Sequence, residues 1–264
     1  MRTIRTVDEA RAALADAGSV GLVPTMGALH AGHLSLFEAA RAENDTVVAS
    51  LFVNPAQFGD EADLAAYPRD EARDGQVAAE TGVDLLFAPP LEEMYPAGFQ
   101  TWVEVEEASA GQEGDARPGH FRAVATVCLK LFNIVHPARA YFGQKDAQQA
   151  VVIRRLVRDL DLPLEIRVLP TVRDPDGLAL SSRNVLLSPE ERGRALSLPR
   201  ALAKGAETYR LGGDAVAAAT AELNGLTPDY VELLDLDGAL VLAGAVRVGS
   251  IRVIDNVLLK GELG

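Results

Sequence analysis

The sequence predicts an α/β protein, in which a parallel β-sheet covered by helices is followed by a smaller α+β domain. Short β-branched segments alternate with longer Ala-rich amphipathic segments up to about Val172, a pattern typical of successive strand–helix units. The predicted strands are almost wholly apolar, as expected for strands that are buried on both faces of a sheet. The alternation then stops, and we therefore predict a first domain over residues 1–172 and a second domain over residues 173–264.

The elements of the first domain follow from its hydrophobic periodicity. Ligands bind at the carboxyl ends of the strands in such sheets, so the segments that follow the strands are candidate parts of a site. The predicted strands cover residues 20–23, 46–52, 85–87, 139–142 and 165–169, and the predicted helices cover residues 8–17, 33–43, 70–81, 121–135 and 146–159.

The second domain contains a clear helix start. Ser188 suits the N-cap position, Pro189 suits the first helical position, and Glu190 and Glu191 suit the positive end of the helix dipole. We expect this helix to continue towards Tyr209. A further helix is predicted over residues 214–223, and strands are predicted near residues 230–234, 246 and 251–256.

Composition narrows the classes of function. Of the 264 residues, 48% are hydrophobic, which is enough for a core, and the formal net charge of −13 argues against a nucleic-acid partner. The longest apolar stretches, such as residues 46–53, are too short to span a bilayer, and the first residues lack the apolar core of a signal peptide. Cys128 is the only cysteine, which excludes an internal disulfide. We therefore expect a cytoplasmic protein with no membrane association.

The strongest chemical signal is the segment 24–33, Pro-Thr-Met-Gly-Ala-Leu-His-Ala-Gly-His, which leaves a buried strand and enters a helix. Gly27 and Gly32 permit close approach of the backbone to a ligand. His33 is expected at the helix N-terminus, where unpaired N–H groups and the helix dipole favour phosphate. Together, His30 and His33 could donate hydrogen bonds as negative charge moves onto a leaving pyrophosphate. A metal pair is the alternative, but the sequence offers no evident third ligand nearby.

A second signal is Gly143-Gln144-Lys145-Asp146, which again follows a strand and precedes a helix. Lys145 could meet a phosphate as a point charge. Asp146 could cap the helix or help to position Mg²⁺ or a ribose. An ordinary capped turn would have the same sequence pattern, so this segment alone does not decide between the two.

Three further features are weaker. The segment 180–184, Leu-Ser-Ser-Arg-Asn, suits a phosphate clamp, although such sequences are also common in solvated loops. Gln57 and Gln149 could hydrogen-bond a substrate hydroxyl or carboxylate, although either could instead be structural. Cys128 lies among apolar residues and is expected to be a core thiol, and His120 is expected at a helix entry or at the rim of an active site.

Taken together, these segments resemble one family, the pantothenate synthetases, also called pantoate–β-alanine ligases. The resemblance spans essentially the whole chain and rests on seven landmarks in the order and spacing of the family. The landmarks are residues 24–33, 54–59, 67–69, 118–122, 141–149, 170–173 and 180–184.

The resemblance implies a Rossmann-like nucleotidyltransferase domain, a smaller C-terminal lid domain and a homodimer. It also implies a reaction in which the carboxylate of pantoate attacks the α-phosphate of ATP, with Mg²⁺ present, to give pantoyl-adenylate and pyrophosphate. The amine of β-alanine then attacks the acyl carbon, which releases AMP and pantothenate.

The roles of residues also carry over by position. The resemblance implies that His33 is catalytic, that Gln57 binds pantoate and β-alanine, and that Gln149 binds pantoate. With the reasoning from the residues above, we expect His33, His30 and Lys145 to be the catalytic residues. The resemblance adds no expectation for a metal ligand, so the ligands of Mg²⁺ stay open. The residues implied to contact ATP are Met26, Gly27, Ala28, Leu29, His30, Ala31, Gly32, His33, Gly143, Gln144, Lys145, Asp146, Val172, Leu180, Ser181, Ser182 and Arg183.

Two positions depart from the usual pattern of the family. Gln144 stands where Glu is common, so the side chain keeps its size and an acceptor but loses the charge. Leu180 stands where Met is common, a change that nearly conserves volume. Neither change removes an essential group, so we expect activity to survive.

Two other functions would share some of these features. Another nucleotidyltransferase with a His-x-Gly-His turn would act on a phosphorylated substrate, and it would usually present more cationic residues than this chain does. A regulatory module would bind ATP without turnover. Gln57 and Gln149 favour an uncharged or hydroxy-acid partner over a phosphorylated one.

Overall fold

The computed structural model describes residues 1–59 and 61–263, which divide into two compact units. The first unit comprises Met1–Phe142 and Val152–Leu169, and the second comprises Gly143–Val151 and Pro170–Gly264. The second unit therefore includes a short internal segment that the alternation of strands and helices does not indicate. The predicted boundary at residue 172 stays a prediction.

The first unit is built on a parallel sheet that, within the described residues, has six strands in the order β1-β4-β3-β2-β5-β6. This arrangement confirms the predicted fold class. The order of the strands reverses between β2 and β5, and in such sheets this switch point is where ligands bind. The short β1 was not predicted. The strands are β1 (Arg2–Ile4), β2 (Val20–Thr25), β3 (Thr46–Leu51), β4 (Leu85–Phe87), β5 (Arg139–Gly143) and β6 (Glu165–Leu169).

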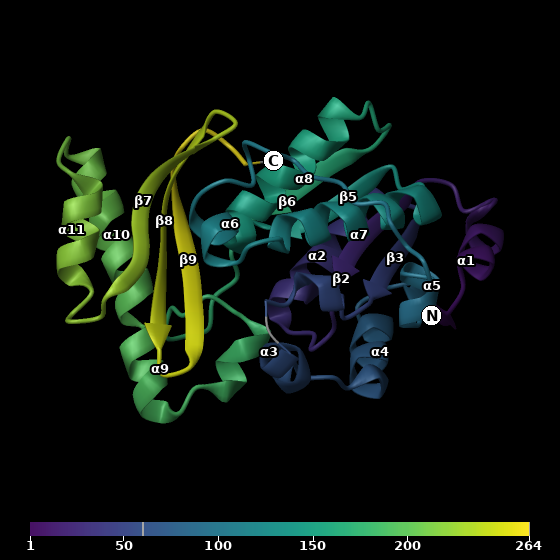
Figure 1. Ribbon diagram of the computed structural model, residues 1–264, viewed down its shortest axis with the longest axis horizontal. Coiled ribbons are helices and arrows are strands. Elements are labelled where there is room, and N and C mark those ends of the chain that lie inside the picture. Colours follow the sequence, from purple (N-terminus) through teal and green to yellow (C-terminus); the bar gives the residue numbers. More distant parts are fainter. Residues whose placement is uncertain (60, 264) are drawn as a thin grey trace. The chain divides into compact units, whose positions relative to one another are not determined.

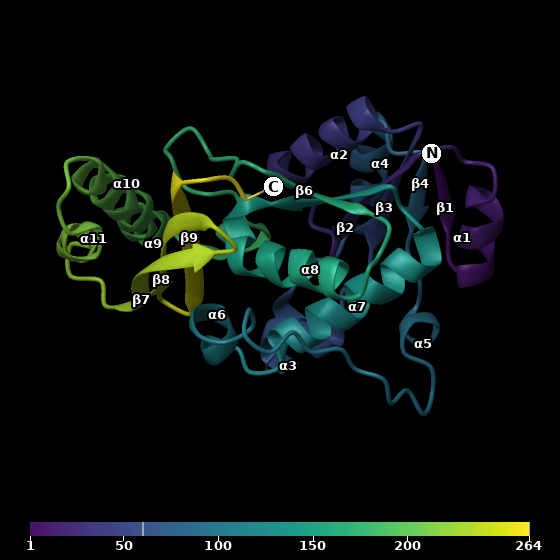
Figure 2. The ribbon, with the colours of Figure 1, turned by 90° about the horizontal axis from the view of Figure 1, so that it is seen from above.

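Helices cover both faces of this sheet (Figures 1 and 2). Figure 2 shows α2 (Ala31–Glu43) and α4 (Glu71–Glu80) on one face and α7 (His120–Val135) and α8 (Ala147–Asp159) on the other. Short elements lie in the connections, of which the sequence predicted only the first helix. They are α1 (Val7–Leu14), η1 (Pro55–Gln57), α3 (Glu61–Ala66), α5 (Leu91–Met94) and α6 (Gln112–Ala116).

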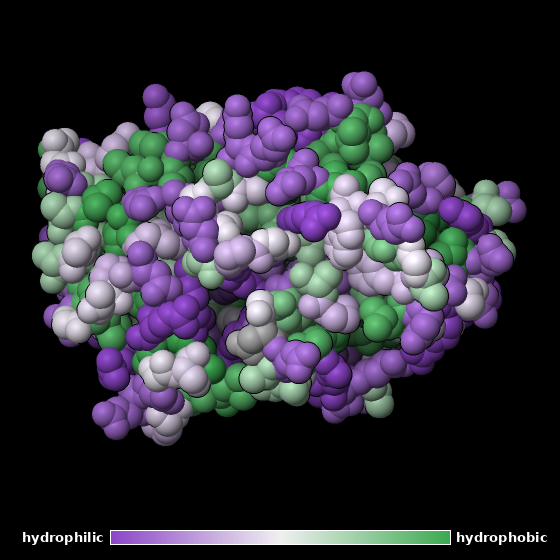
Figure 3. Space-filling model, in the orientation of Figure 1, coloured by the Kyte–Doolittle hydropathy of each residue, from purple (hydrophilic) through white to green (hydrophobic). Residues whose placement is uncertain are grey.

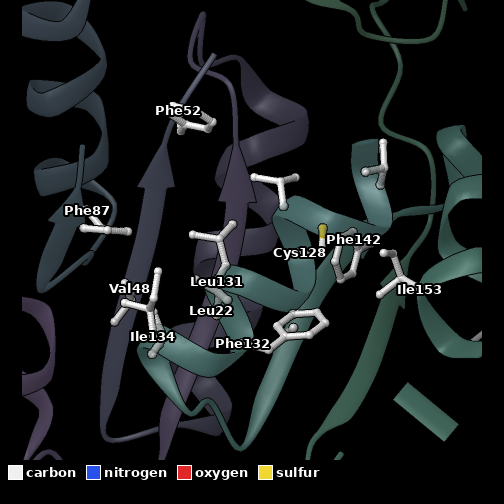
Figure 4. Packing of buried hydrophobic residues seen from close by; sticks show 14 of the residues in the cluster. Leu22, Val48, Phe52, Phe87, Cys128, Leu131, Phe132, Ile134, Phe142 and Ile153 are labelled. Atoms are coloured by element: carbon white, nitrogen blue, oxygen red, sulfur yellow. The ribbon is translucent and has the colours of Figure 1, made fainter. Parts of the chain in front are cut away.

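Successive residues of a strand point to opposite faces of the sheet, so a layer of core lies on each face. Leu22 and Val48 are fully buried on the face covered by α7, where Leu131 and Phe132 pack against the sheet (Figure 4). Burial of each such side chain contributes about 1.5–3 kcal/mol to the free energy of unfolding. Cys128 belongs to the same cluster, and burial raises the pKa of its thiol to about 12. This confirms the expected core thiol, which stays protonated and unreactive.

The second unit contains an antiparallel sheet that, in the part of the chain described, has three strands in the order β7-β8-β9. Helix α10 packs against it so closely that a Cβ on Gly244 would lie 3.1 Å from Cδ1 of Leu198. The elements of this unit are η3 (Ser182–Leu186), α9 (Pro189–Ala195), α10 (Ser197–Arg210), α11 (Ala215–Glu222), β7 (Pro228–Leu236), β8 (Ala239–Val248), β9 (Ile251–Lys260) and η2 (Gln144–Asp146), the last from the internal segment.

The predicted helix from Ser188 towards Tyr209 is wrong in one respect. Ser188 does cap a helix with a capping box formed with Glu191, but the helix ends after seven residues, and α10 begins two residues later. Pro199 lies in the first turn of α10, where its missing N–H costs nothing. In one continuous helix the same proline would remove an internal hydrogen bond, so the break avoids that loss.

Polar and apolar residues are interspersed on the visible surface. Figure 3 shows hydrophilic residues spread over the face in view, as expected for a chain with 38 acidic and 25 basic residues. Among residues 1–59 and 61–263, no helix is long and apolar enough to cross a membrane.

Candidate functional site

The chain leaves β2 through a tight turn that leads into α2. Thr25 donates its hydroxyl hydrogen to the carbonyl oxygen of Ser50 (2.6 Å), and its oxygen accepts from the N–H of Gly27 (3.3 Å). Gly27 has φ +85° and Ala28 has φ +52°. A side chain in this left-handed region costs about 1 kcal/mol, so the turn needs contacts that hold it.

The carboxylate of Asp74, on α4, provides such contacts. Asp74 is 1% exposed, and its two oxygens accept from the N–H of Ala28 (2.7 Å) and of Leu29 (2.8 Å). The neighbouring Arg73 donates to the carbonyl oxygen of Leu29 (3.2 Å). A Cβ on Gly27 would lie 2.8 Å from the carboxylate, so this position requires glycine. Charge-assisted bonds of this kind contribute roughly 1.5–3 kcal/mol each, which exceeds the cost of the strained turn.

The hydrogen bonds of the two histidines define their tautomers. His30 is the N-cap of α2, and its Nδ1 accepts from the N–H of Gly32 (3.2 Å), while Nδ1 of His33 accepts from the N–H of His30 (3.3 Å). A backbone N–H can only donate, so each neutral ring carries its proton on Nε2. The ring centroids lie 4.1 Å apart, so the two rings are direct neighbours. Helix α2 begins at Ala31, two residues before the predicted start, so His33 lies within its first turn.

Gln57 lies at the end of η1, beyond the carboxyl end of β3, and is buried. Asn54 accepts from the N–H of Ala56 (3.3 Å), which fixes the orientation of its amide, and it donates to Oε1 of Gln57 (2.8 Å). The amide of Gln57 is thereby oriented too, with Nε2 as its donor. An oriented donor of this kind suits a carboxylate or a hydroxyl. Because β2 and β3 are adjacent and parallel, Gln57 and the histidines follow the same edge of the sheet.

The backbone of Gln57 is held by Arg117 and His120. Its carbonyl oxygen accepts from Nη2 of Arg117 (3.1 Å) and from Nδ1 of His120 (3.0 Å), and Nη1 of Arg117 lies 3.3 Å from Nε2 of His120. A carbonyl only accepts and a guanidinium only donates, so a neutral His120 carries its proton on Nδ1, the opposite tautomer to His30. Sequence reasoning missed this function of Arg117. It placed His120 at a helix entry, which the start of α7 confirms.

In the second unit, the turn after β5 is held by Asn256 of β9. The Nδ2 of Asn256 donates to the carbonyl oxygens of Gln144 and Lys145, both at 2.9 Å, and its Oδ1 accepts from Nε2 of Gln144 (3.1 Å). The side chain of Lys145 is 20% exposed, and its Nζ lies 3.8 Å from Oδ1 of Asp146. Asp146 lies in the 3-10 helix η2, just before α8.

The polar loop of residues 181–183 is ordered by the backbone around it. Leu180 donates its N–H to the carbonyl oxygen of Val172 (3.0 Å), so two predicted ATP contacts are direct neighbours. Ser181 caps η3, and its Oγ accepts from the N–H of Arg183 (3.3 Å). Gln149, in the first turn of α8, is half-buried.

The turn of residues 174–177, next to this loop, is fixed to α9 by Arg192. Arg192 donates to Asp176 (2.8 Å) and to Asp174 (2.6 Å). The hydrogen bond from Arg192 also lowers the pKa of the Asp176 carboxyl. The turn is therefore an integral part of the second unit.

A metal pair at His30 and His33 finds no support. Among residues 1–59 and 61–263, no group of three or more His, Cys, Asp and Glu side chains could hold a metal ion. Each Nδ1 of the pair also accepts a backbone hydrogen bond, which occupies the lone pair that would bind the metal.

Comparison with known proteins gives a consistent result over the whole chain. The family described as pantoate-beta-alanine ligase matches residues 1–258. A pantothenate synthetase of Roseiflexus castenholzii is 54% identical over 98% of this chain and 100% of its own length. A pantothenate synthetase of Moorella thermoacetica is 53% identical over 98% of both chains.

Solved structures agree with the sequence relatives. The crystal structure of a pantothenate synthetase from Thermus thermophilus is 50% identical, with a TM-score of 0.95 over 99% of this chain and 100% of that chain. A pantoate-beta-alanine ligase from Francisella tularensis, crystallised with beta-gamma ATP and beta-alanine, is 34% identical, with a TM-score of 0.85 over the full length of both chains.

Proposed function

This chain belongs to the pantoate-beta-alanine ligase family, and we propose how its residues carry out the reaction of that family. The chain is an ATP-dependent ligase that condenses pantoate with β-alanine to give pantothenate. In the first step, a carboxylate oxygen of pantoate bonds to the α-phosphorus of ATP, and the bond from that phosphorus to pyrophosphate breaks. In the second step, the amine of β-alanine bonds to the acyl carbon, loses a proton and displaces AMP.

The observation that carries this proposal is the pair of histidines with their protons on Nε2. Negative charge accumulates on the pyrophosphate oxygens as they leave, and two preorganised N–H donors would stabilise it. Removal of one such donor typically costs about 10²–10³-fold in rate. We assign His30 and His33 to this role, at the start of a helix whose dipole also favours phosphate.

Lys145 complements these donors with a full positive charge on the phosphates of ATP. The loop of Ser181, Ser182 and Arg183 is proposed to bind ATP as well, with Arg183 as a planar donor for phosphate oxygens. We propose that this loop becomes more protected from solvent when ATP and pantoate bind, as in a lid. Hydrogen exchange across residues 180–184, with and without both ligands, tests that part of the proposal. Unchanged exchange would contradict it.

Gln57 is proposed to bind the hydroxy acid. Its Nε2 is held as a donor by the contact between Asn54 and Oε1, which suits the carboxylate or a hydroxyl of pantoate. Gln149 is proposed to bind pantoate too. The chemistry needs no nucleophilic side chain, and the protonated, buried Cys128 is consistent with that.

Mg²⁺ fits this site as a partner of the phosphates. The ion usually takes one or two carboxylates together with phosphate oxygens and water, so it needs no cluster of protein ligands. Asp146 has a half-exposed carboxylate beside Lys145 and would supply such a ligand. The ion would neutralise part of the charge on the triphosphate.

We further propose a cytoplasmic homodimer, as implied by the family. The single cysteine, which excludes internal disulfides, supports a reducing compartment. Light scattering of the purified chain would measure its mass, and a value near 28.0 kDa would contradict the dimer.

One assay separates this proposal from its two rivals. Pyrophosphate release is measured with ATP alone, with pantoate, with pantoate and β-alanine, and with phosphopantoate. We expect release only when pantoate is present, and pantothenate only when β-alanine is added. Release with the phosphorylated substrate alone would indicate another nucleotidyltransferase. ATP binding without release under any condition would indicate a regulatory module.

A further inference from the structure

The turn that carries Lys145 is the short 3-10 helix η2, which leads directly into α8, and side-chain contacts from outside it help to fix where the lysine lies. Strand β9, at the yellow end of the chain in Figure 1, provides Asn256, whose side chain is 3% exposed. The partner atoms lie 112 and 111 residues earlier in the sequence. The buried amide donates to two carbonyl groups of the same short turn. This arrangement is specific, because it ties both carbonyls to one side chain from a distant strand.

The direction of each hydrogen bond is fixed by chemistry. The atom of Asn256 that lies 2.9 Å from two carbonyl oxygens must be the amide nitrogen, because carbonyl oxygens only accept. Oδ1 of Asn256 therefore faces the side chain of Gln144, which must present its own amide nitrogen at 3.1 Å. The two amides match in this one orientation, and reversal of either would oppose two donors or two acceptors.

Asn256 is itself held in place through its backbone N–H. The carboxylate of Asp255 accepts from the N–H of Asn256 (2.8 Å) and binds Arg173 through both oxygens (2.6 and 3.0 Å). Arg173 also donates to the carbonyl oxygen of Gly177 (3.1 Å). The backbone of Asn256 is thus held by an ion pair in which Asp255 is buried and the side chain of Arg173 is 31% exposed, and this contact limits how far the strand can move to relieve a lost contact.

We infer that Asn256, paired with Gln144, is a positioning residue for Lys145 and sets the geometry in which the lysine meets the phosphates of ATP. This inference rests on the proposed role of Lys145 and goes beyond it, since Asn256 itself touches no substrate in this account. The side chain acts through the backbone of the turn. Its loss therefore affects the use of ATP more than the use of pantoate.

The test compares Asn256→Asp with Asn256→Ala in steady-state kinetics of pyrophosphate release. Asp has the shape of Asn but cannot donate to the two carbonyls when ionised. If donation matters, Asn256→Asp lowers kcat/KM for ATP by about tenfold or more, at least as much as Asn256→Ala does, while KM for pantoate changes less than twofold. If only shape mattered, Asn256→Asp would resemble the wild type, which would overturn the inference.

A matched control is Asn44→Asp in the first unit. Asn44 is also buried, and its Nδ2 donates to the carbonyl oxygen of Ala40 (2.8 Å) and to the hydroxyl of Tyr141 (2.7 Å), before the amino end of β3. The same substitution there should lower the thermal midpoint but leave KM for ATP unchanged. An equal rise in KM for ATP in both variants would show that general destabilisation, and not the turn, is responsible.

Two more variants keep the outcome decisive. If Asn256→Asp does not fold, Gln144→Ala removes the partner of Oδ1 and should raise KM for ATP two- to fivefold, again without an effect on pantoate, since one net hydrogen bond is lost. No rise in KM for ATP would overturn the inference.

Lys145→Ala tests the proposed function of Lys145 separately. If it leaves the use of ATP unchanged, the role of Lys145 fails and the inference fails with it. If it impairs ATP use while the Asn256 variants do not, only the positioning role is refuted.

Discussion

The turn after β2 carries His30 and His33, and the turn after β5 carries Lys145. All three side chains are proposed to bind phosphate, yet the two turns are held in place by opposite chemistry. At the histidine turn, the carboxylate of Asp74 accepts from two backbone N–H groups. At the Lys145 turn, the amide of Asn256 donates to two backbone carbonyls. One anchor is a buried anion and the other is neutral.

The difference lies in which backbone groups each turn presents to its anchor. Both anchors bind main-chain atoms, whereas the histidine rings accept backbone N–H groups of their own turn through Nδ1. The histidine turn needs an acceptor because its strained backbone points successive N–H groups inward, at Ala28 and Leu29. At the Lys145 turn, the carbonyl oxygens of Gln144 and Lys145 face the anchor, so the anchor is a donor.

The largest expected effect is at His33. His33→Ala removes one donor to the leaving pyrophosphate and should slow pyrophosphate release about 10²–10³-fold. The variant should remain folded by circular dichroism, because the ring is partly exposed and Asp74 still holds the turn. Release within tenfold of the wild-type rate would refute the role of His33.

The anchor of the same turn should matter almost as much. Asp74→Asn keeps the shape but turns an amide N–H₂ towards the N–H of Ala28 or Leu29, which leaves a buried donor without an acceptor. We expect the free energy of unfolding to fall by about 1–3 kcal/mol in urea denaturation and the rate to fall about tenfold or more. Asp176→Asn, which alters a more exposed carboxylate, is the matched control and should leave the rate unchanged. If Asp74→Asn were as stable as the wild type, Asp74 would not be the anchor of the histidine turn.

Gln57 should show the reverse substrate preference. Gln57→Glu keeps an oxygen for Asn54 but replaces the donor Nε2 with a carboxylate oxygen, which would repel the carboxylate of pantoate. We expect kcat/KM for pantoate to fall at least tenfold, while the affinity for ATP measured by titration calorimetry stays near that of the wild type. A fall in ATP affinity with unchanged pantoate kinetics would show that the residue is misassigned.

The smallest expected effect is at Gln144, where the resemblance to the family led us to expect Glu. Gln144→Glu cannot donate to Oδ1 of Asn256, and the amide of Asn256 cannot reverse because its nitrogen serves two carbonyls. We expect KM for ATP to rise two- to fivefold, as for loss of one net hydrogen bond. An unchanged KM would mean that the side chain of Gln144 does not contribute to the anchor.

The sequence predicted the features that depend on contiguous residues and missed the contacts between residues that lie far apart in the chain. The strands of the sheet and the histidine turn follow from residues that are contiguous in the chain, and glycine and histidine types already suggest a phosphate site. Asp74 contacts the turn from 46 residues away, and Asn256 from 112 residues away. Nothing in the periodicity of α4 or β9 marks these side chains as inward-facing anchors, because an Asp in a helix and an Asn in a strand are normally solvated.

The same reasoning explains the smaller errors. Helix α2 begins at Ala31 because His30 serves as its N-cap, a position usually taken by Ser, Thr, Asp or Asn. The function of Arg117 depends on a contact with Gln57 across 60 residues. The orientation of the Gln57 amide depends in turn on Asn54, which lies in the landmark of residues 54–59 but had no predicted role.

The most direct test of the central claim is exchange of labelled pyrophosphate into ATP, measured with pantoate present and β-alanine absent. If the histidine turn and the Lys145 turn serve the formation of pantoyl-adenylate, the label enters ATP under these conditions, and both His33→Ala and Lys145→Ala reduce the exchange rate. The account predicts no exchange without pantoate. Exchange that requires β-alanine, or that is unaffected in both variants, would contradict it.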